Sequence, residues 1–358
     1  MTEASNKLRI AILFGGRSAE HDVSILSATN VMNALDAARY EAVPVFVTCD
    51  GRWLLASFAD GALSRPAQGT ELCLLAGGQG RAIAIPESGL PYELARIDIV
   101  FPVLHGLHGE DGSVQGLAEV ARVPLAGCGI CGSANALDKD IAKRLLKEAG
   151  IPVARAVTIT RQTIPPFDEL KETLGLPVFV KPARQGSSVG VSKVRTQADF
   201  EKALAEGFRH DDKLLAEEFI QGREIECGVL EDENRGLFVS RTGEIAPAES
   251  HGFYSYDAKY IDADGAAVKV PAELPEAVEN EMRAVAAKAF LALGCDSMAR
   301  VDFFLTPDMR FLLNEVNTIP GFTDISMYSK VMAISGITYP EVIDRLVAQG
   351  LARAARAN

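Results

Sequence analysis

The sequence predicts a mixed α/β protein, with a parallel sheet near the N-terminus and a strand-rich C-terminal part. Strand-like apolar segments alternate with helical segments over residues 1–127, which is typical of a parallel sheet with helices on its faces. Strands predominate from about residue 223 onward, which adds an α+β character. The chain has 358 residues, so two or three domains are expected.

Apolar strands are predicted in the N-terminal part at residues 8–14, 42–47 and 97–104. The helix that follows the first strand is expected to carry Val23, Leu26 and Val31 on its inner side. Residues 57–95 are rich in Gly, Ala and Pro, and they indicate no clear helix or strand.

A helix is predicted at residues 138–149, because Asp138 can cap its start and Pro152 prevents it from restarting after Gly150. Its inner face is expected to carry Ile141, Leu145 and Leu146. Residues 151–220 then alternate short strands with a helix near residues 197–206.

The C-terminal part is interrupted by a long helix at residues 276–293, where Val278, Met282, Val285, Ala289 and Leu293 recur at helical spacing. A last helix is predicted at residues 340–349, since proline is favoured in a first helical turn.

Residues 250–269 are polar and contain three tyrosines but few large aliphatic side chains. Such a stretch inside an apolar domain predicts a lid or Ω-loop. Lys259 and Tyr260 are the candidates for reaching inward. An inert surface excursion is the alternative.

Residues 300–305 and 311–317 are predicted to form a hairpin, with a Pro-Asp turn between its strands. Side chains alternate along a strand, so Glu315 and Asn317 share a face, and Asp302 faces them if the register allows. Two carboxylates and an amide oxygen suit Mg²⁺, which takes waters and substrate phosphates as its remaining ligands. The absence of sulfur and imidazole argues against zinc or copper. A solvated hairpin face without a metal is the alternative.

A glycine-containing turn at residues 15–21 joins the first strand to the first helix. Helix N-termini attract anions, but the carboxylate of Glu20 would instead suit an ammonium group. The alternative is that Glu20 only interacts favourably with the helix dipole.

The strand at residues 178–182 contains Lys181 and is followed by a Gly/Ser loop at residues 183–190 and another strand. Such a loop can cover a triphosphate and offer N–H and hydroxyl donors. It is not a Walker loop, because the spacing of glycines and lysine differs and no helix follows. An ordinary flexible hairpin is the alternative.

Two further segments resemble cofactor-binding or metal-binding motifs, but neither is expected to bind a cofactor or a metal. Residues 127–132 match Gly-x-Gly-x-x-Gly, but the acidic residue about twenty positions on, Glu148, is predicted to lie on a helix and not at the end of a strand. Cys128 and Cys131 form a lone Cys-x-x-Cys, which cannot complete a zinc site. His105 and His108 lie in a glycine-rich loop, where substrate contact or loop structure is favoured over metal binding.

The net charge of −12 argues against a general nucleic-acid binder, because phosphate backbones require clustered Lys and Arg. No apolar run approaches the length of a membrane span, and residues 1–9 lack the apolar core of a signal peptide. Six scattered cysteines are typical of reduced thiols, so a cytoplasmic protein without a membrane partner is expected.

Several of these segments occur together and in one order. They include Gly15-Gly16-Arg17-Ser18-Ala19-Glu20-His21, Leu104-His105-Gly106 with Gly109-Glu110-Asp111-Gly112, Asp138-Lys139, Lys181-Pro182, Gly186-Ser187-Ser188-Val189-Gly190, Tyr256-Asp257-Ala258-Lys259-Tyr260, Arg300-Val301-Asp302 and Asn314-Glu315-Val316-Asn317-Thr318-Ile319-Pro320-Gly321. In this order, and over nearly the whole chain, they resemble the D-alanine–D-alanine ligases, a family of ATP-grasp enzymes.

The resemblance implies an ATP-grasp fold with an N-terminal Rossmann-like domain. It divides the chain into an N-terminal α/β domain at residues 1–127, a central subdomain at residues 128–222 and a C-terminal subdomain at residues 223–358, with a lid loop at residues 250–269. The central and C-terminal subdomains would hold ATP between two sheets.

The resemblance also implies ATP-dependent ligation of two D-alanines to D-alanyl-D-alanine through an acyl phosphate, with release of ADP and phosphate, for peptidoglycan and cell-wall synthesis. A related ATP-grasp ligase with D-lactate or D-serine as acceptor is the alternative. The implied ligands of two Mg²⁺ ions, for which Mn²⁺ can substitute, are Asp302, Glu315 and Asn317. The family suggests a homodimer.

The implied ATP-binding residues are Lys139, Lys181, Ser188, Glu217, Glu218, Phe219, Ile220, Glu224, Lys259 and Phe304. The implied substrate-binding residues are Glu20, His105, Arg300, Gly321 and Ser326. In catalysis, Arg300 and the Gly321 N–H would bind the developing oxyanion. Glu20, Ser187 and Tyr260 would form a hydrogen-bonded trio that ties the domains together and excludes water.

Two other functional classes are alternatives. A non-catalytic nucleotide-binding regulator on this fold would be expected to lose Glu20, Tyr260 or a metal ligand, and all are present. A nicotinamide oxidoreductase would have to use residues 127–132, and a titration that detects no NAD binding would exclude it.

Overall fold

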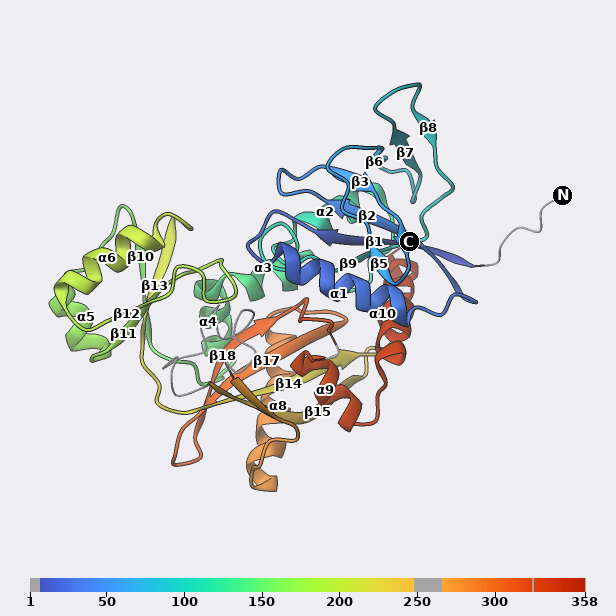
Figure 1. The fold of residues 1–358 in the computed structure, drawn as a ribbon. Helices are drawn as coiled ribbons and strands as arrows, with labels where there is room; N and C mark the ends of the chain where they lie inside the picture. The colour runs from blue at the N-terminus through green and yellow to red at the C-terminus, as the bar shows by residue number, and fades with distance from the viewer. Residues whose placement is uncertain (1–6, 248–265, 324, 358) are drawn as a thin grey trace.

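The computed structural model describes residues 7–247, 266–323 and 325–357 of the chain. Lys259 and Tyr260 therefore lie outside the described residues. The strands form three main sheets, of seven, four and five strands, and a small two-stranded ribbon (Figure 1). Each main sheet packs against helices. In Figure 1 the seven-stranded sheet lies at the upper right, the four-stranded sheet at the left and the five-stranded sheet below.

The N-terminal sheet has the strand order β8-β7-β6-β3-β2-β1-β9. Its strands are β1 (Leu8–Gly15), β2 (Tyr40–Val47), β3 (Trp53–Leu55), β6 (Glu71–Leu74), β7 (Ala82–Ile85), β8 (Tyr92–Glu93) and β9 (Ile99–Pro102). β1 is parallel to both β2 and β9, which confirms the predicted parallel sheet. The middle of β1 is a continuous buried apolar run, as expected for a strand covered on both faces.

The segment that the sequence left unassigned, residues 57–95, adds antiparallel strands to this sheet and forms the ribbon of β4 (Phe58–Ala59) and β5 (Ala62–Leu63). These strands have two to four residues each. Strands this short contain too few residues to show a clear alternation.

Helices cover both faces of the N-terminal sheet. One face packs against α1 (His21–Ala34) and α10 (Tyr339–Ala357), and the other packs against α2 (Ser113–Ala121). The prediction that Leu26 lies on the inner side of α1 is wrong, because its side chain is 58% exposed. The buried side chains of this helix are Ser24, Ile25, Ser27, Ala28 and Val31. Three of these five are serine or alanine, so apolar periodicity did not reveal the inner face.

The central sheet is antiparallel, with the order β10-β13-β11-β12. Its elements are β10 (Ala156–Thr160), α5 (Phe167–Leu174), β11 (Val178–Pro182), β12 (Ser192–Val194), α6 (Gln197–Gly207) and β13 (Lys213–Glu218). Phe167 of α5 and Phe200 of α6 pack together with ring centroids 5.8 Å apart, in the apolar core of this sheet. Two helices precede the sheet, α3 (Ile130–Leu137) and α4 (Lys139–Glu148).

Helix α4 has the predicted start, and the Asp138 side chain accepts hydrogen bonds from the N–H groups of Asp140 and Ile141. Its inner face differs from the prediction. Ile141 and Leu145 are only half-buried, whereas Lys143 is buried beside Leu146. A buried lysine falls outside any apolar pattern, so periodicity alone could not place this face.

The C-terminal sheet is antiparallel, with the order β16-β15-β14-β17-β18. Its strands are β14 (Arg223–Glu231), β15 (Leu237–Pro247), β16 (Ala266–Lys269), β17 (Met298–Leu305) and β18 (Phe311–Asn317). Helix α8 (Glu276–Ala292) covers one face with Met282, Ala286, Ala289 and Phe290. Helix α9 (Met327–Ile334) contacts β14 and β15.

Helix α10 extends from Tyr339 to Ala357, well beyond the predicted end at residue 349. It crosses to the N-terminal sheet, where Arg353 donates hydrogen bonds to the carbonyl oxygens of Leu125 and Gly127 at 2.9 and 3.0 Å. A Cβ at Gly350 would lie 2.5 Å from the Leu125 carbonyl oxygen, so glycine allows this close approach. The end of the chain thus binds the N-terminal part to the C-terminal sheet.

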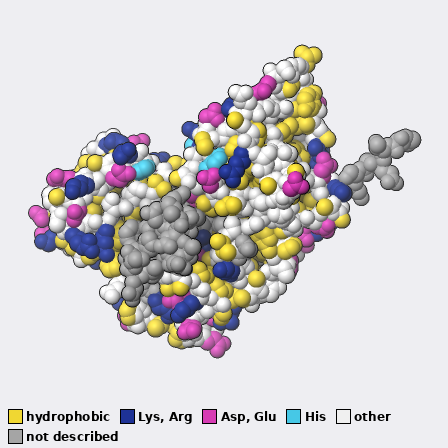
Figure 2. Space-filling view, viewed as in Figure 1, with side chains coloured by type: hydrophobic (Ala, Val, Ile, Leu, Met, Phe, Trp, Pro, Cys, Tyr) yellow, Lys and Arg dark blue, Asp and Glu magenta, His cyan; other side chains and the backbone are white. Residues whose placement is uncertain are grey.

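Figure 2 shows one face of the molecule, where Lys and Arg side chains alternate with Asp and Glu. Within the described residues, no helix combines the length and the apolar character required to cross a membrane.

Candidate active site

A cavity of about 540 Å³ lies between the central sheet and the C-terminal sheet. Its lining includes most of the predicted nucleotide-binding residues, namely Lys139, Lys181, Ser188, Glu217, Glu218, Phe219, Ile220, Glu224 and Phe304. These residues come from α4, β11, the loop after β11, β13, the segment between β13 and β14, β14 and β17. The structure therefore brings together residues that are far apart in the sequence.

The acidic hairpin of β17 and β18 forms one wall of this cavity. Asp302 pairs directly with Glu315 across the two strands, and Arg300 pairs with Asn317. The Asn317 amide donates a hydrogen bond of 3.0 Å to Asp302 Oδ2. The pairing shifts by one residue at a β-bulge between Phe303 and Asp302, and this shift brings Asp302 opposite Glu315. Asp302, Glu315 and Asn317 therefore share one face of the hairpin, as expected if the register allowed it.

The donor set of this hairpin fits a hard cation, because it offers only carboxylate and amide oxygens. Within the described residues, no group of three or more His, Cys, Asp or Glu side chains could hold a metal. Asp302 and Glu315 supply only two carboxylates, so a bound cation would need oxygens from the substrate or from water to complete its shell. Such a cation would neutralise charge on the phosphate oxygens.

Arg300 is half-buried beside the carboxylates of Asp302 and Glu226. Its guanidinium forms two hydrogen bonds to Asp302, of 2.8 and 2.7 Å, and lies 3.0 Å from Glu226 Oε2. Burial by itself would lower the pKa of Arg300, but the negative charges of Asp302 and Glu226 raise this pKa well above its usual value. The guanidinium therefore stays charged and is held in one orientation.

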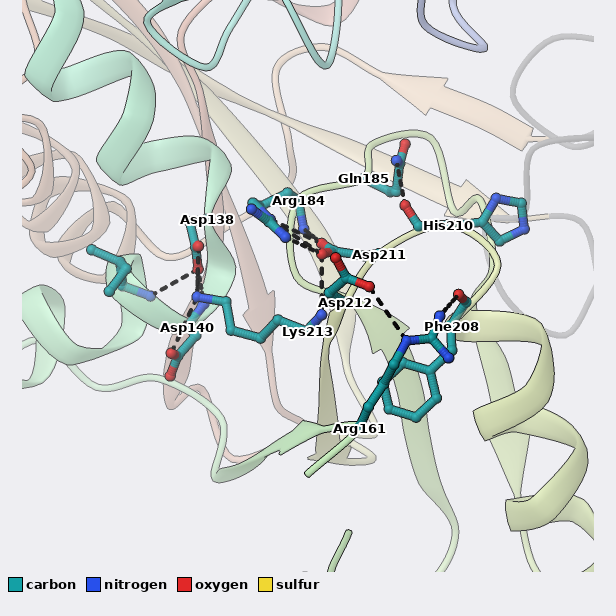
Figure 3. Close-up of polar contacts among 11 residues, drawn as sticks. Asp138, Asp140, Arg161, Arg184, Gln185, Phe208, His210, Asp211, Asp212 and Lys213 are labelled. Atoms are coloured by element: carbon teal, nitrogen blue, oxygen red, sulfur yellow. Dashed lines mark hydrogen bonds and ion pairs between the residues drawn. The ribbon is translucent and has the colours of Figure 1, made fainter. Parts of the chain in front are cut away.

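Helix α4 brings Lys139 to the cavity. Its Nζ donates a hydrogen bond of 2.7 Å to the Gln185 carbonyl oxygen and lies 3.8 Å from Glu315 Oε2. The start of this helix is fixed to β13, since Lys213 Nζ lies 2.6 Å from Asp138 and 3.4 Å from Asp140 (Figure 3). Anchoring at the first turn limits the movement of the adjacent Lys139.

The Gly/Ser loop joins the two predicted strands, β11 and β12, which pair antiparallel. Ser187 and Ser188 both have left-handed backbone angles, with φ values of +48° and +59°. Two such residues in succession are uncommon outside glycine and indicate a locally constrained loop. The base of the loop is held by the ion pair between Arg184 and Asp211 (Figure 3).

The Ser187 hydroxyl donates a hydrogen bond to the carboxylate of Glu20. This contact joins the loop of the central sheet to the turn after β1, over a sequence separation of 167 residues. A Cβ at Gly186 would lie 2.9 Å from Glu20 Oε2, so a side chain at this position would displace the carboxylate from its present place. The structure thus places two members of the predicted trio in contact, while Tyr260 lies outside the described residues.

A second, smaller cavity of about 70 Å³ lies beside the first. It is lined by the predicted substrate-binding residues Glu20, His105, Arg300 and Gly321, and by Asn317. Lys139, Ser187 and Glu315 line both cavities. The two cavities therefore meet at the acidic hairpin.

His105 is fixed on both sides of its ring. Nδ1 donates to the Ile319 carbonyl oxygen at 2.9 Å, and the Ser27 hydroxyl lies 3.2 Å from Nε2. Burial lowers the pKa of His105, and the charge of Glu20 only partly opposes this shift. A neutral imidazole follows, which suits a role in shaping the pocket.

Ser326 does not line either of these two cavities. Its Oγ accepts a hydrogen bond of 3.1 Å from the Thr323 N–H and lies 2.6 Å from the Thr323 hydroxyl. A Cβ at Gly321 would lie 2.8 Å from this Oγ, so Ser326 lies directly behind the glycine that lines the smaller cavity. Its predicted contact with a substrate carboxylate remains a prediction.

The glycines at residues 127–132 have a packing role. A Cβ at Gly132 would lie 2.5 Å from the Gly294 carbonyl oxygen and 2.6 Å from Cys128 Sγ. Helix α3 begins within this segment at Ile130, and Cys128 is buried against the segment that contains Cys295. The space beside Gly129 and Gly132 is filled by protein, whereas a Cβ at Gly127 would have no atom within 4 Å.

Glu110 is a site residue to which the sequence assigned no role. Its carboxyl group accepts hydrogen bonds from the N–H groups of Gly106 and Ile319, at 2.7 and 2.9 Å, and so joins the two loops that line the smaller cavity. Burial raises the pKa of Glu110 to about 8, and the charge of Glu20 adds to this increase. In the sequence, only the Gly109-Glu110-Asp111-Gly112 segment of the family resemblance indicated that Glu110 belongs to the site.

Glu110→Gln is expected to reduce the loss of stability with rising pH. The folded pKa of about 8 lies above the ordinary value of 4.5, so the protonated carboxyl contributes stability that is fully present below about pH 4.5. This stability is lost as the pH rises through 8, by an amount on the order of 4 kcal/mol. Urea unfolding between about pH 5 and about pH 8.5 would measure it.

The exposed Glu119 in α2 offers a matched control. Glu119→Gln should retain the wild-type dependence of the free energy of unfolding on pH. If the Glu110 and Glu119 variants lose stability equally as the pH rises, Glu110 is not protonated in the folded protein.

The comparisons with known proteins agree with this geometry. Residues 9–128 match the family described as D-ala D-ala ligase N-terminus, and residues 145–348 match D-ala D-ala ligase C-terminus. The chain is 73% identical over 350 residues to D-alanine--D-alanine ligase A of Brucella suis, which covers 98% of this chain and 99% of that protein. It is 57% identical over 352 residues to D-alanine--D-alanine ligase A of Mesorhizobium japonicum, with coverage of 97% and 98%.

Solved structures show the same fold. The D-alanine-D-alanine ligase from Coxiella burnetii superposes with a TM-score of 0.84 at 34% identity, covering 98% of this chain and 96% of that chain. The VanG D-Ala:D-Ser ligase from Enterococcus faecalis has a TM-score of 0.84 at 33% identity, with coverage of 96% and 99%. The fold is therefore the ATP-grasp fold that the resemblance implied, and the chain belongs to the D-alanine–D-alanine ligase family.

Proposed function

We propose that this chain joins two D-alanine molecules to D-alanyl-D-alanine at the expense of ATP. The observation that supports this most directly is the meeting of two cavities at one acidic hairpin. The larger cavity, of about 540 Å³, has a volume typical of small-molecule sites. The smaller one suits a compact amino acid. A phosphoryl group carried by a nucleotide in the first could reach a carboxylate held in the second.

The reaction requires activation, because the oxygen of a free carboxylate is a poor leaving group. Transfer of the terminal phosphoryl group of ATP to the first D-alanine gives an acyl phosphate and ADP. The amine of the second D-alanine then attacks the acyl carbon, the C–O bond to phosphate breaks, and the amine loses a proton. The tetrahedral intermediate carries an oxyanion, which the site must stabilise.

On the nucleotide side, we assign the phosphates to Lys139 and Lys181, whose ammonium groups line the larger cavity. Ser188 offers a further donor from the Gly/Ser loop. The end of β13 and the residues after it, Glu217 to Ile220, are assigned to adenine. Phe304 would pack on the base, and Glu224 would bind the ribose hydroxyls. Lys259 of the lid segment would add a further cation.

For the metal we propose two Mg²⁺ ions, with Mn²⁺ as a substitute, bound by Asp302, Glu315 and Asn317. When bound, the ions supply positive charge along the triphosphate. The all-oxygen character of the hairpin supports this choice over a softer metal.

On the substrate side, Glu20 is assigned to the ammonium group of the first D-alanine, and Arg300 with the Gly321 N–H to the developing oxyanion. His105 shapes the pocket, and Ser326 is assigned to the carboxylate of the second D-alanine. Ser187 and Glu20, which are in contact, would complete a trio with Tyr260 and exclude water from the acyl phosphate.

Beyond the single site, we propose domains at residues 1–127, 128–222 and 223–358, with a lid at residues 250–269. We further propose a homodimer in the cytoplasm that supplies dipeptide for peptidoglycan synthesis, and through it for cell-wall formation and cell shape. The family identity supports each of these proposals.

Phosphate release from ATP tests the function directly. With Mg²⁺ present, D-alanine as sole substrate is expected to give phosphate and the dipeptide, because one molecule can serve as acyl donor and another as amine acceptor. D-lactate, D-serine or L-alanine alone should give no product above background. Chromatography of the dipeptide would confirm coupling, whereas a folded protein that shows no dependence on D-alanine would exclude the proposal.

A further inference from the structure

A buried lysine lies behind the nucleotide cavity. Lys143 of α4 is only 4% exposed, and its Nζ is 2.7 Å from Glu217 Oε2 and 3.4 Å from the Ala154 carbonyl oxygen. It does not line the cavity, although Glu217 and Lys181 do. An ammonium group buried this deeply is costly unless an opposite charge compensates it. The carboxylate of Glu217 provides this compensation.

Glu217 itself lies between two ammonium groups. Its Oε1 is 2.8 Å from Lys181 Nζ, on the cavity side, and its Oε2 is 2.7 Å from Lys143 Nζ, on the core side. Burial would raise the pKa of Glu217, but the charges of Lys181 and Lys143 outweigh it and lower this pKa. Burial lowers the pKa of Lys143, and the charge of Glu217 opposes this shift. With both lysines protonated, the cluster contains one carboxylate and two ammonium groups.

The charge balance of this cluster matters for a nucleotide. A Glu217–Lys181 pair alone would be neutral, and moving Lys181 to a phosphate would leave a buried carboxylate without a counter-ion. With Lys143 present, the cluster carries one excess positive charge, and Glu217 keeps a partner when Lys181 leaves. The same helix also carries Lys139 one turn earlier, and its Nζ lies 3.8 Å from Glu315 of the acidic hairpin.

We propose that Lys143 is the permanent counter-ion of Glu217 and thereby frees Lys181 to bind a nucleotide phosphate. Lys143 is a positioning residue, since it acts through Glu217 and Lys181 and touches no substrate. The inference rests on the proposed function, because it requires that a nucleotide occupies the larger cavity.

The test compares two ligands of the same site, MgADP and adenosine, by isothermal titration calorimetry. Lys143→Met keeps the volume of the side chain and removes its charge. It is expected to raise the Kd of MgADP about tenfold, the scale typical of losing a partner that orients a binding side chain. The Kd of adenosine should change by less than about twofold, because adenosine has no phosphate for Lys181 to bind.

Three further variants separate a counter-ion from a packing role. Lys143→Arg keeps the charge and should retain wild-type affinity for MgADP. The double variant Lys143→Met with Glu217→Gln removes both charges, so Lys181 is no longer held by Glu217. Its ratio of the Kd of MgADP to the Kd of adenosine should return toward the ratio measured for Glu217→Gln alone. Lys147→Met removes the same charge from an exposed position on α4 and should leave both Kd values unchanged.

The outcomes are distinguishable. If the wild-type protein binds neither ligand, the proposed function of the cavity fails. If the wild-type protein binds both, and Lys143→Met weakens both equally with no recovery in the double variant, Lys143 only fills space and the inference is overturned. Should Lys143→Met not fold, the double variant is compared with Glu217→Gln. Equal affinity for MgADP supports the counter-ion role, and a further loss contradicts it.

Discussion

Glu315→Gln is expected to lower kcat by a factor on the order of 10² to 10³, the loss typical of removing one electrostatic partner of a transition state. Glu315 pairs with Asp302 across the hairpin and lies 3.8 Å from Lys139, so its carboxylate is placed where a cation and the triphosphate would meet. Glutamine keeps the shape of the side chain and one carbonyl oxygen, but it removes the negative charge that attracts a divalent cation.

The measurement is phosphate release as a function of Mg²⁺ concentration, at saturating ATP and D-alanine. The Mg²⁺ concentration needed for half-maximal activity should rise in the variant, together with the fall in kcat. The control is Asp308→Asn in the turn of the same hairpin, where the exposed carboxylate pairs only with Thr306 and Arg310 among the described residues. An unchanged Mg²⁺ dependence in Glu315→Gln would place the metal elsewhere.

Arg300→Lys is expected to reduce kcat by a factor on the order of 10² to 10³, with a much smaller change in the Kd of ATP. The guanidinium is held by two hydrogen bonds to Asp302 and by Glu226, and it lines the smaller cavity. Lysine retains the charge, but it cannot bind a carboxylate in a bidentate manner and also present a donor to an oxyanion. The loss should therefore fall on the chemical step.

Single-turnover measurements of dipeptide formation, together with a titration of ATP, would separate the two effects. Arg310→Lys is a matched control, because Arg310 lies in the same hairpin and forms an exposed ion pair of 2.6 Å with Asp308. It should leave both quantities unchanged. If Arg300→Lys weakens ATP binding as strongly as it slows the reaction, Arg300 acts in nucleotide binding and not on the oxyanion.

The acidic hairpin shows what could be predicted from sequence. Alternation along the strands placed Glu315 and Asn317 on one face. The sequence did not predict the β-bulge between Phe303 and Asp302, which brings Asp302 opposite Glu315 where the register of the turn would pair it with Asn314. The start of α4 was also predictable, because Asp138 caps its own helix through backbone groups two and three residues away. These features depend on contacts that are close in the chain.

Helix α1 shows where this reasoning failed. Leu26 is apolar but exposed, and the inner face carries Ser24, whose hydroxyl donates to the Val103 carbonyl oxygen and accepts from the Gly15 N–H. A serine that satisfies two backbone groups can be buried without cost from unpaired polar atoms. Apolar periodicity does not detect such a position.

The sequence by itself determined the strand and helix types of the longer elements, the acidic face of the hairpin and, through its ordered motifs, the family. Only the tertiary structure decided that Ser187 contacts Glu20, that Glu110 joins two loops of the smaller cavity, and that Lys143 is buried behind Glu217. The physical reason is distance along the chain. Backbone geometry determines which neighbouring residues share a face, whereas contacts between residues far apart depend on how whole sheets and helices pack.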